Sequence, residues 1–454
     1  MIMQTIAQPA PRETDPYLEK FQRFEKEGAG RQPSWLFPIR KAGLARFGER
    51  GFPTLKDEDW RFTNVAPIAK LPFKPVLQPS TAGLSEKSLD QFPFANLHCH
   101  RLVFVDGHFA AGLSRLLPLE AGVEVGSLAA ALAGKPARLQ SYFANSARDG
   151  RNAFAALNTA FFMDGAFIHV PAGVTIAQPV HLLFISTAPE PGATAHPRNI
   201  VVAGKDSRLT LLETYAGIGE VPCLTNAVSE FVVGENAAVE HCKFQDEPWS
   251  AYHLATLQIA LGARANFISH SIATGAKLSR NSIKTLLDGE GVECVLNGLY
   301  LTKDEQLADH HMIVEHAKPH CNSHEYFNGI LDDRSRGVFH GRILVRQEAQ
   351  KTDAKQTNKN LLLSDTATID TKPQLEIYAD DVKCTHGATV GQLNEESIFY
   401  LRARGMSLQT ARRMLIHAFA GEIIDRIRCE PVRKELDEVI WGRLEQNPHF
   451  AATP

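Results

Sequence analysis

A glycine recurs four times in matching surroundings, and this repeat limits the fold more than any other feature of the chain. Gly204, Gly234, Gly262 and Gly289 are spaced 30, 28 and 27 residues apart. Each is followed five residues later by an apolar or thiol side chain, and those residues are Leu209, Val239, Phe267 and Cys294. The segments between them are short β-branched runs with turn residues, as in "EFVVGENAAVEHCKF". A looser copy surrounds Gly173.

A repeat of this size, with strands and no long helix, predicts a β-solenoid. One coil cannot bury its inward face alone, so successive coils stack on one another. We expect the glycine to form a tight corner and the residue five positions later to point inward. A propeller would need longer repeats with a blade signature, and a β-sandwich would not produce this glycine-plus-five pattern. The sequence therefore favours a mainly β fold with a β-helix core over residues 151–390.

The two flanks of this core have helical patterns. Apolar residues at three-to-four spacing follow residue 15, and "SWLFPIRKAGLARFGERG" and "GSLAAALAGKPARLQSYF" also read as helices, with "RLVFVDG" as a short strand and turn between them. We expect a mostly helical N-terminal domain over residues 1–150. After residue 391, Ser407 is placed to cap a helix whose apolar stripe runs from Leu408 to Ile427. We expect a helical C-terminal domain over residues 391–454, which caps the solenoid or docks a partner.

Composition excludes several classes of function. The formal net charge is −3 and charged residues make up 22% of the chain, so it lacks the basic surplus of a nucleic-acid-binding protein. No apolar run approaches the length of a membrane span. The N-terminal residues "MIMQTIAQPAPRETDPYLEK" have neither the apolar core of a secretory signal nor the Arg and Ser of a transit peptide. We expect a cytoplasmic protein that binds neither nucleic acid nor membrane.

The seven cysteines are scattered singly, which fits a reducing compartment better than a disulfide framework. They are Cys99, Cys223, Cys242, Cys294, Cys321, Cys384 and Cys429. None forms a CxxC pair, so no local motif builds a cysteine-rich metal site.

A histidine-rich stretch, "DHHMIVEHAKPHCNSHEYF", offers a zinc hypothesis. His316, His320 and His324 would share one face of a helix. Pro319 interrupts that helix, however, and "HMIVEH" reads as a strand. The histidines are then distributed over rungs and turns of the solenoid, and this structural interpretation is the one we favour.

A second alternative is a β-solenoid enzyme acting on a carbohydrate or acyl substrate. Such enzymes need carboxylates that flank one bond, and Asp332 and Asp333 are the close acidic pair here. Adjacent side chains on an extended chain point to opposite faces, so this pair does not form an acid and base couple. The sequence also lacks a GxSxG elbow, a phosphate-binding loop and a dinucleotide fingerprint. We expect a protein that is not itself an enzyme.

The stretch "DDVKCTHGATVG" places a thiol and an imidazole two residues apart. On a strand, Cys384 and His386 project from one face, about 7 Å apart. Zinc and iron–sulfur sites commonly take four protein ligands. The pair is therefore either structural or part of a site that another chain completes, and spacing alone does not decide between these.

Three stretches resemble the SufB/SufD family of scaffold subunits of the SUF iron–sulfur cluster assembly complex. They are "QLEIYADDVKCTHGATVGQLNEESIFYLRARGMSLQTARRMLIHAFAGEIIDRI", "FHGRILVRQEAQKTDAKQTNKNLLLSDTATIDTKPQLEI" and "DEDWRFTN". The likeness covers most of the chain and is most specific over residues 310–430. The SufD branch fits better than SufB, which has Glu-His-Glu-Ala-Thr at the position of "CTHGAT" and additional N-terminal cysteines.

The resemblance implies a right-handed parallel β-helix flanked by helical domains. It further implies pairing with SufB through the β-helix, a homodimer when the chain is isolated, and docking of the SufC ATPase on the C-terminal helices. For that docking we single out Leu408, Arg412, Arg413, Leu415 and Phe419.

A nascent iron–sulfur cluster is expected at the SufB–SufD interface. His386 matches the family's interface histidine, a metal ligand shared with the partner chain, and Cys384 is its neighbour in the same motif. A flavin is associated with the family's complexes, although no motif in this chain identifies a flavin site.

Overall fold

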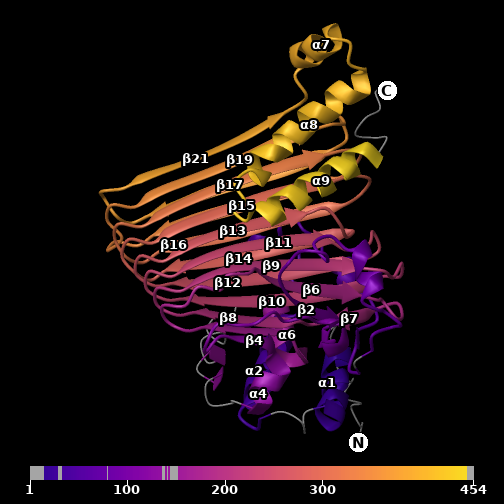
Figure 1. Ribbon diagram of the computed structural model, residues 1–454, viewed down its shortest axis with the longest axis vertical. Helices are drawn as coiled ribbons and strands as arrows, with labels where there is room; N and C mark the ends of the chain where they lie inside the picture. Colours follow the sequence, from indigo (N-terminus) through magenta and orange to yellow (C-terminus); the bar gives the residue numbers. More distant parts are fainter. Residues whose placement is uncertain are drawn as a thin grey trace, which may run out of the picture.

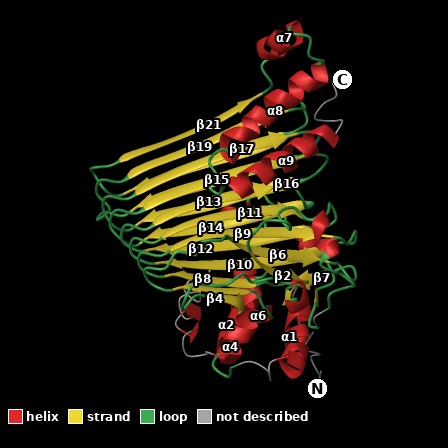
Figure 2. Cartoon of the chain, in the orientation of Figure 1, coloured by secondary structure: helices red, strands yellow, loops and turns green. Residues whose placement is uncertain are grey.

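Two long sheets that face each other form the body of the protein (Figure 1). The computed structural model describes residues 15–28, 33–78, 80–134, 139–140, 142–143 and 152–446. From residue 198 onwards the chain alternates between the two sheets, so each coil adds one strand to each of them in parallel register. The expected β-helix core with helices on both sides is confirmed (Figure 2).

The first sheet has 11 strands and the second has 10. The first contains β4 (Glu124–Ser127), β5 (Ala166–Val170), β8 (Arg198–Ala203), β10 (Cys223–Val233), β12 (Tyr252–Leu261), β14 (Leu278–Leu287), β16 (Leu307–His316), β18 (Arg336–Val345) and β20 (Thr368–Ile377), with the short β1 (Lys74–Pro75) and β7 (Ala193–Ala195) beside them. The second contains β2 (His100–Val105), β3 (His108–Phe109), β6 (Val180–Ser186), β9 (Arg208–Gly217), β11 (Ala238–Asp246), β13 (Asn266–Ala273), β15 (Glu293–Thr302), β17 (Asn322–Leu331), β19 (Asp353–Leu362) and β21 (Lys383–Gly391).

The repeated glycines lie at stacked corners between the two sheets, but for a different reason than expected. None of the four has a positive φ. Each instead lies against the backbone of the preceding corner, and a Cβ added at Gly289 would be 2.0 Å from the amide nitrogen of Ala263. The left-handed residue of each corner comes two positions later, as at Asn236 (φ 55°) and Arg264 (φ 55°). Close stacking, and not the turn itself, therefore requires glycine here.

The residues five positions after the glycines point inward, as predicted. Val239 pairs with Leu209 below it and with Phe267 above it, and Phe267 pairs in turn with Cys294. All four are buried in the main apolar cluster between the sheets. Because the strands are in register, each column of inward side chains runs along the whole solenoid.

The N-terminal helices cover one end of the solenoid. They are α1 (Asp15–Gly28), α2 (Leu36–Arg50), α3 (Ala66–Ala69), α4 (Leu128–Gly134) and α6 (Ala153–Phe161), with 3₁₀ turns η2 (Glu58–Trp60), η3 (Lys87–Gln91) and η4 (Ala111–Leu113). Leu36 and Leu128 pack on Phe167 of β5 and Ile200 of β8 in one apolar cluster. The buried Arg40 ties α2 to α6 by donating hydrogen bonds to the carbonyl oxygens of Ala160 (3.0 Å) and Phe162 (2.6 Å).

The expected N-terminal elements are present where the structure describes them. Both early helices form, and the strand and turn expected over residues 101–107 are β2 and its turn. Of the helix expected over residues 126–143, α4 covers Leu128–Gly134, and part of the remainder lies outside the described residues. This region also contributes strands, because β2 and β4 extend the two sheets.

The C-terminal helices are α7 (Glu395–Ala403), α8 (Leu408–Ile424) and α9 (Glu430–Gln446). Ser407 caps α8 as predicted, accepting a hydrogen bond from the amide of Thr410 (3.0 Å). The apolar faces of α8 and α9 pack on the outer face of the second sheet, where Ile416 and Ile423 share a cluster with Leu299 and Ile330. Among the described residues, no helix combines the length and apolarity that a membrane crossing requires.

Candidate functional site: the open end of the β-helix

The solenoid is open at the end opposite the N-terminal helices (Figure 1). Among the described residues, β20 pairs only with β18 and β21 pairs only with β19. One row of backbone hydrogen-bonding groups on each terminal strand is therefore left without a neighbouring strand. Tyr378 (62% exposed) and Val390 (51% exposed) lie at the same end. Unpaired strand edges beside exposed apolar side chains are a template for association with another chain.

Cys384 and His386 lie on the last strand, at this open end. Cys384 pairs with Ala354 of β19 and His386 pairs with Gln356. Ala354 and Gln356 are buried between the sheets. Because in-register neighbours point to the same face of a sheet, the thiol and the imidazole both point toward the mouth of the solenoid interior. The expected one-sided arrangement of the pair follows from this register.

Cys384 continues the column of inward residues that the repeat identified. From Cys294 the column passes through Ser323 and Ala354 to Cys384. Burial, reinforced by the nearby Asp353, raises the pKa of the Cys384 thiol. The thiol is therefore protonated near neutral pH, and a metal or cluster must displace that proton to bind the sulfur.

His386 ends the neighbouring column, above Gln356 and Glu325. Burial raises the pKa of Glu325 to about 8, and Gln356 donates a hydrogen bond to it (2.6 Å). The Glu325 carboxyl is therefore mostly protonated at neutral pH. Because His386 itself is exposed, its imidazole is available to a ligand that arrives from outside.

The pair cannot complete a metal site by itself. Within the part of the chain that the structure describes, no group of three potential metal ligands includes Cys384 or His386. An iron–sulfur cluster commonly takes four protein ligands, so a cluster held by this pair would need further ligands from another chain. The two side chains are thus an incomplete set of potential ligands, at an end where the described residues provide no further strand.

The structure separates the three histidines of the zinc hypothesis. His316 is buried at the end of β16, within 2.8 Å of the Ser323 hydroxyl. His320 is a corner residue with φ 59°, and the partly exposed His324 on β17 lies 3.5 Å from Asp353. The three histidines therefore do not share one site, and His316 is buried and not on an exposed loop as expected.

The acidic pair also occupies a corner. Asp333 adopts φ 52°, and Asp332 is buried while Asp333 is half-buried. The sequence argument assumed that the two residues lie on an extended chain, whereas the structure places them in a corner between β17 and β18.

The C-terminal residues singled out for ATPase docking lie in different surroundings. Phe419 packs partly into the cluster beneath α8, and Arg413 bonds Glu445 of α9 (2.8 Å) with its guanidinium over Trp441. Leu408, Arg412 and Leu415 are half-buried. Part of the amphipathic stripe of α8 is therefore used within the chain.

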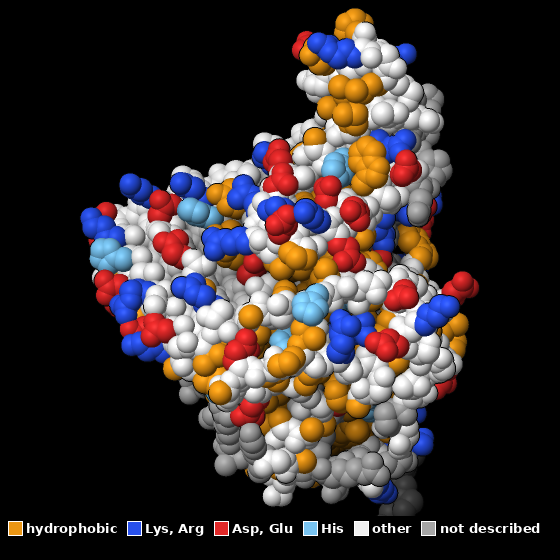
Figure 3. Space-filling view, in the orientation of Figure 1, with side chains coloured by type: hydrophobic (Ala, Val, Ile, Leu, Met, Phe, Trp, Pro, Cys, Tyr) orange, Lys and Arg blue, Asp and Glu red, His pale blue; other side chains and the backbone are white. Residues whose placement is uncertain are grey.

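Sequence reasoning missed the exposed apolar side chains of α7. Phe399 is 75% exposed and Tyr400 is 54% exposed, and Met414 of α8 is 37% exposed. Figure 3 shows hydrophobic side chains gathered over this projecting helix. The signal was available in "EESIFYLRARG", where two adjacent aromatic residues interrupt a polar helix.

These features define a class of protein: a two-sheet parallel β-helix, closed by helices at one end and carrying a thiol and an imidazole at the open end. Family models agree over both regions. The model described as "SUF system FeS cluster assembly, SufBD core domain" matches residues 184–419, and "SufBD protein N-terminal region" matches residues 12–182. The chain belongs to the SufBD family of iron–sulfur cluster assembly proteins.

Relatives extend over nearly the whole chain. The iron–sulfur cluster assembly protein SufD of Escherichia coli is 34% identical over 93% of this chain and 95% of its own length. An iron–sulfur cluster assembly SufBD family protein of Synechocystis is 33% identical over 91% of this chain and 92% of its own. The chloroplastic protein ABCI7 of Arabidopsis thaliana is 28% identical over 95% of this chain and 91% of its own. The chain is a SufD homologue.

Proposed function

We propose that this protein is a non-catalytic scaffold subunit on which an iron–sulfur cluster is assembled at an interface with a SufB subunit. The open end of the β-helix pairs with the open end of SufB. The cluster is cargo, held between the two chains and then released. The resemblance to SufD and the membership of the SufBD family support this assignment.

One observation carries the proposal: Cys384 and His386 terminate two adjacent inward columns at an end where no further strand covers them. Thiolate and neutral imidazole both bind iron. Because two ligands are too few for a cluster, the remaining ligands come from the partner, opposite His386. A site divided between two chains can also open when the chains separate, which suits a product that must leave.

The second contact is with a SufC-type ATPase. We place it on α7 and the adjoining start of α8, where Phe399, Tyr400 and Met414 are exposed. Aromatic residues and methionine are enriched at protein interfaces, and this helix projects away from the solenoid (Figure 1). Leu408, Arg412 and Leu415 border the same surface, whereas Arg413 and Phe419 support it from within.

Several finer expectations stay predictions. They are the homodimer of the isolated chain, a cytoplasmic location, the flavin of the assembled complex and the domain boundaries at residues 150 and 390. A homodimer would use the same unpaired edges as the heterodimer, so the two assemblies compete for one surface.

The test is reconstitution of the complex with its SufB and SufC partners, followed by cluster formation measured by visible absorbance and acid-labile sulfide. We expect His386→Ala to lower the cluster yield strongly and Cys384→Ser to lower it less. His320→Ala is the matched control, because His320 is an exposed histidine of a corner and not of the open end. Size-exclusion chromatography verifies that each variant still assembles. Unchanged cluster yield from assembled His386→Ala would refute the ligand role.

A further inference from the structure

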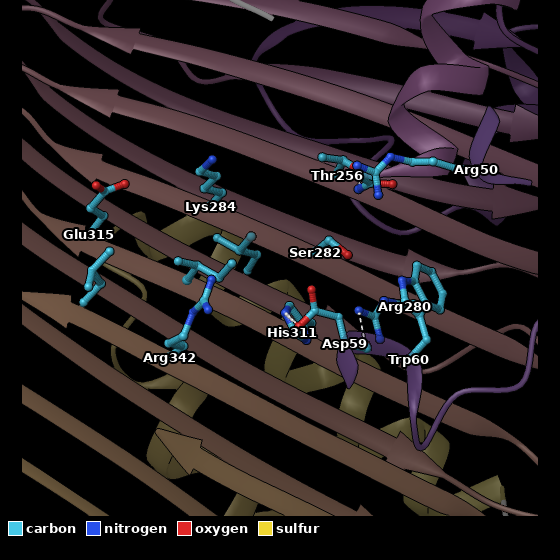
Figure 4. A pocket seen from close by; sticks show the side chains of 14 residues that line it. Arg50, Asp59, Trp60, Thr256, Arg280, Ser282, Lys284, His311, Glu315 and Arg342 are labelled. Carbon is cyan, nitrogen blue, oxygen red and sulfur yellow. Dashed lines mark hydrogen bonds and ion pairs between the residues drawn. The ribbon is translucent and has the colours of Figure 1, made fainter. Parts of the chain in front are cut away.

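A cleft of about 500 Å³ lies on the outer face of the first sheet (Figure 4). The N-terminal turn η2 forms one wall with Asp59 and Trp60, and strands β14, β16 and β18 form the floor. His311 of β16 points into this cleft. Residues more than 200 positions apart in the sequence therefore meet here.

Three potential metal ligands converge at one side of the cleft. His311 and His340 are in-register neighbours on β16 and β18, with ring centroids 4.3 Å apart. Asp59 reaches them from η2, and each of the three offers a ligand atom within 4.8 Å of the others. The Asp59 Oδ1 and His311 Nε2 atoms are 3.7 Å apart. Two ligands about 2.1 Å from one ion, at a tetrahedral angle, are about 3.4 Å apart, so this spacing suits a shared metal.

Hydrogen bonding prepares His340 as a ligand. Its Nε2 lies 2.6 Å from the side-chain oxygen of Gln374, which can only accept. Nε2 must therefore carry the proton, and Nδ1 keeps a free lone pair. A second-sphere carbonyl that fixes the tautomer is the usual support of a metal-binding histidine.

The His311 ring is buried, but its nitrogen atoms are not all hydrogen-bonded. It is 5% exposed, and its Nδ1 atom has no hydrogen-bond partner among the described residues. The other ring nitrogen, Nε2, faces the Asp59 carboxylate at 3.7 Å, which is too long for a hydrogen bond, so this buried ring still has a nitrogen open to a ligand.

Basic residues lie near the histidines, but their charges are compensated. Each of the three cations around the histidines has its own carboxylate: Arg280 bonds Asp309, Lys372 bonds Glu58 (2.7 Å) and Arg342 lies 3.4 Å from Glu376. Arg280 is further held by stacking over Trp60, 3.8 Å from the ring centroid. Among the described residues, the Asp59 carboxylate has no Lys or Arg ion-pair partner, so it remains available to a cation.

We propose that Asp59, His311 and His340 bind one divalent transition-metal ion of the zinc or ferrous class. Two imidazoles and one carboxylate are the ligands that such ions accept while leaving a position open. The open position faces the cleft, where Arg342 and Lys284 suit water or a small anion. The ion fastens η2 to β16 and β18, and so joins the N-terminal region to strands near the open end of the solenoid. None of this depends on Cys384, His386 or the proposed function.

The test uses the full-length protein, stripped with a chelator and titrated with Zn²⁺ against a chromophoric competitor. We expect one tight Zn²⁺ per wild-type chain, and Co²⁺ should give visible d–d absorption when bound in its place. Asp59→Asn and His340→Gln should each lower the affinity for Zn²⁺ by more than ~10–100-fold, which is the loss caused by removing a residue that only hydrogen-bonds to a ligand. The Asp59 side chain is 53% exposed, so Asp59→Asn is not expected to disturb folding.

The matched control is the double variant Cys384→Ser with His386→Ala, which removes the other pair of soft ligands. It should keep the tight Zn²⁺ and the Co²⁺ spectrum. Zn²⁺ should also raise the melting temperature of the wild type and of this control, but not of Asp59→Asn. Absence of tight binding by the wild type would overturn the proposal. So would tight binding that survives Asp59→Asn and His340→Gln, or that disappears in the control.

Discussion

Gln356 lies directly beneath His386 in the register of the second sheet, so the imidazole at the mouth rests on an amide and not on a charge. The amide in turn donates a hydrogen bond to Glu325, one rung further in (2.6 Å). This column links the exposed imidazole to a buried acid. The protonation of that acid therefore affects the stability of the last coils.

Stability should depend on the ionisation of Glu325. Burial raises its pKa to about 8 in the folded state, whereas the unfolded chain has the ordinary value near 4.5. The contribution of Glu325 to the free energy of unfolding is fully present below pH 4.5. It is lost as the pH rises to about 8, at about 1.4 kcal/mol per pH unit. Glu325→Gln removes this loss. Urea denaturation at pH 5.5 and pH 8.5 should show the variant gaining relative to the wild type at the higher pH, and an equal difference at both would contradict the prediction.

Buried histidines should make the protein acid-labile. Burial lowers the pKa of His181, His196 and His310 to about 3, and that of His316 to about 4. The unfolded chain binds these protons near pH 6.5, so stability is present above that pH and is lost as pH falls toward 3 to 4. Each histidine contributes up to about 1.4 kcal/mol per pH unit. Thermal unfolding from pH 7.5 to pH 4.5 measures the loss, and His181→Gln should reduce its slope; a flat profile would be inconsistent with these buried neutral rings.

The stacked corners should not tolerate a side chain. Gly289→Ala places a Cβ 2.0 Å from the Ala263 nitrogen, and we expect a loss of about 1–3 kcal/mol from the forced backbone shift. Gly442→Ala is the control, because Gly442 lies within α9 with no atom within 4 Å of its added Cβ. That change should stabilise the helix by about 0.5–1 kcal/mol. Urea midpoints that move in the same direction for both variants would show that corner stacking is not the cause.

The exposed face of α7 should bind the ATPase without contributing to folding. In the double variant Phe399→Ala with Tyr400→Ala, each change should alter the free energy of unfolding by no more than about 0.5 kcal/mol. The same variant should no longer capture the ATPase in a pull-down. Arg413→Glu should instead lower stability by about 1 kcal/mol, because the Arg413 side chain packs over Trp441 and bonds Glu445. The exposed Lys434→Ala of α9 is the control for both measurements. Full capture by the α7 double variant would locate the ATPase elsewhere.

The solenoid could be predicted because the sequence repeat corresponds to a column of stacked side chains in the structure. The Gly-plus-five residues Leu209, Val239 and Phe267 are stacked in register, and the same column leads to Cys384. The repeat could not be followed in the sequence as far as Cys384, because the later corners lack the glycine. In those corners His320 and Lys351 adopt the left-handed conformation. Cys384 thus points inward because it occupies the same position of the repeat, but only the strand register shows this.

Other features could not be read from one sequence. The stripe of α8 is amphipathic whether it faces a partner or its own sheet, and only packing shows that Ile416 and Ile423 face the sheet. The cluster of Asp59, His311 and His340 joins a 3₁₀ turn to two strands, and no local spacing predicts it. Of the histidine-rich stretch, His311 reaches this cluster, whereas the zinc hypothesis used three others.

The connection between β21 and α7 has a mechanical consequence. The strand ends at Gly391 and the helix begins at Glu395, so three residues join the projecting helix to the strand that bears His386. Among the described residues β21 is hydrogen-bonded to a neighbouring strand on one side only, so it can detach without breaking a second ladder. A body that pulls on α7 therefore loads the ligand strand first, before the load reaches the interior coils.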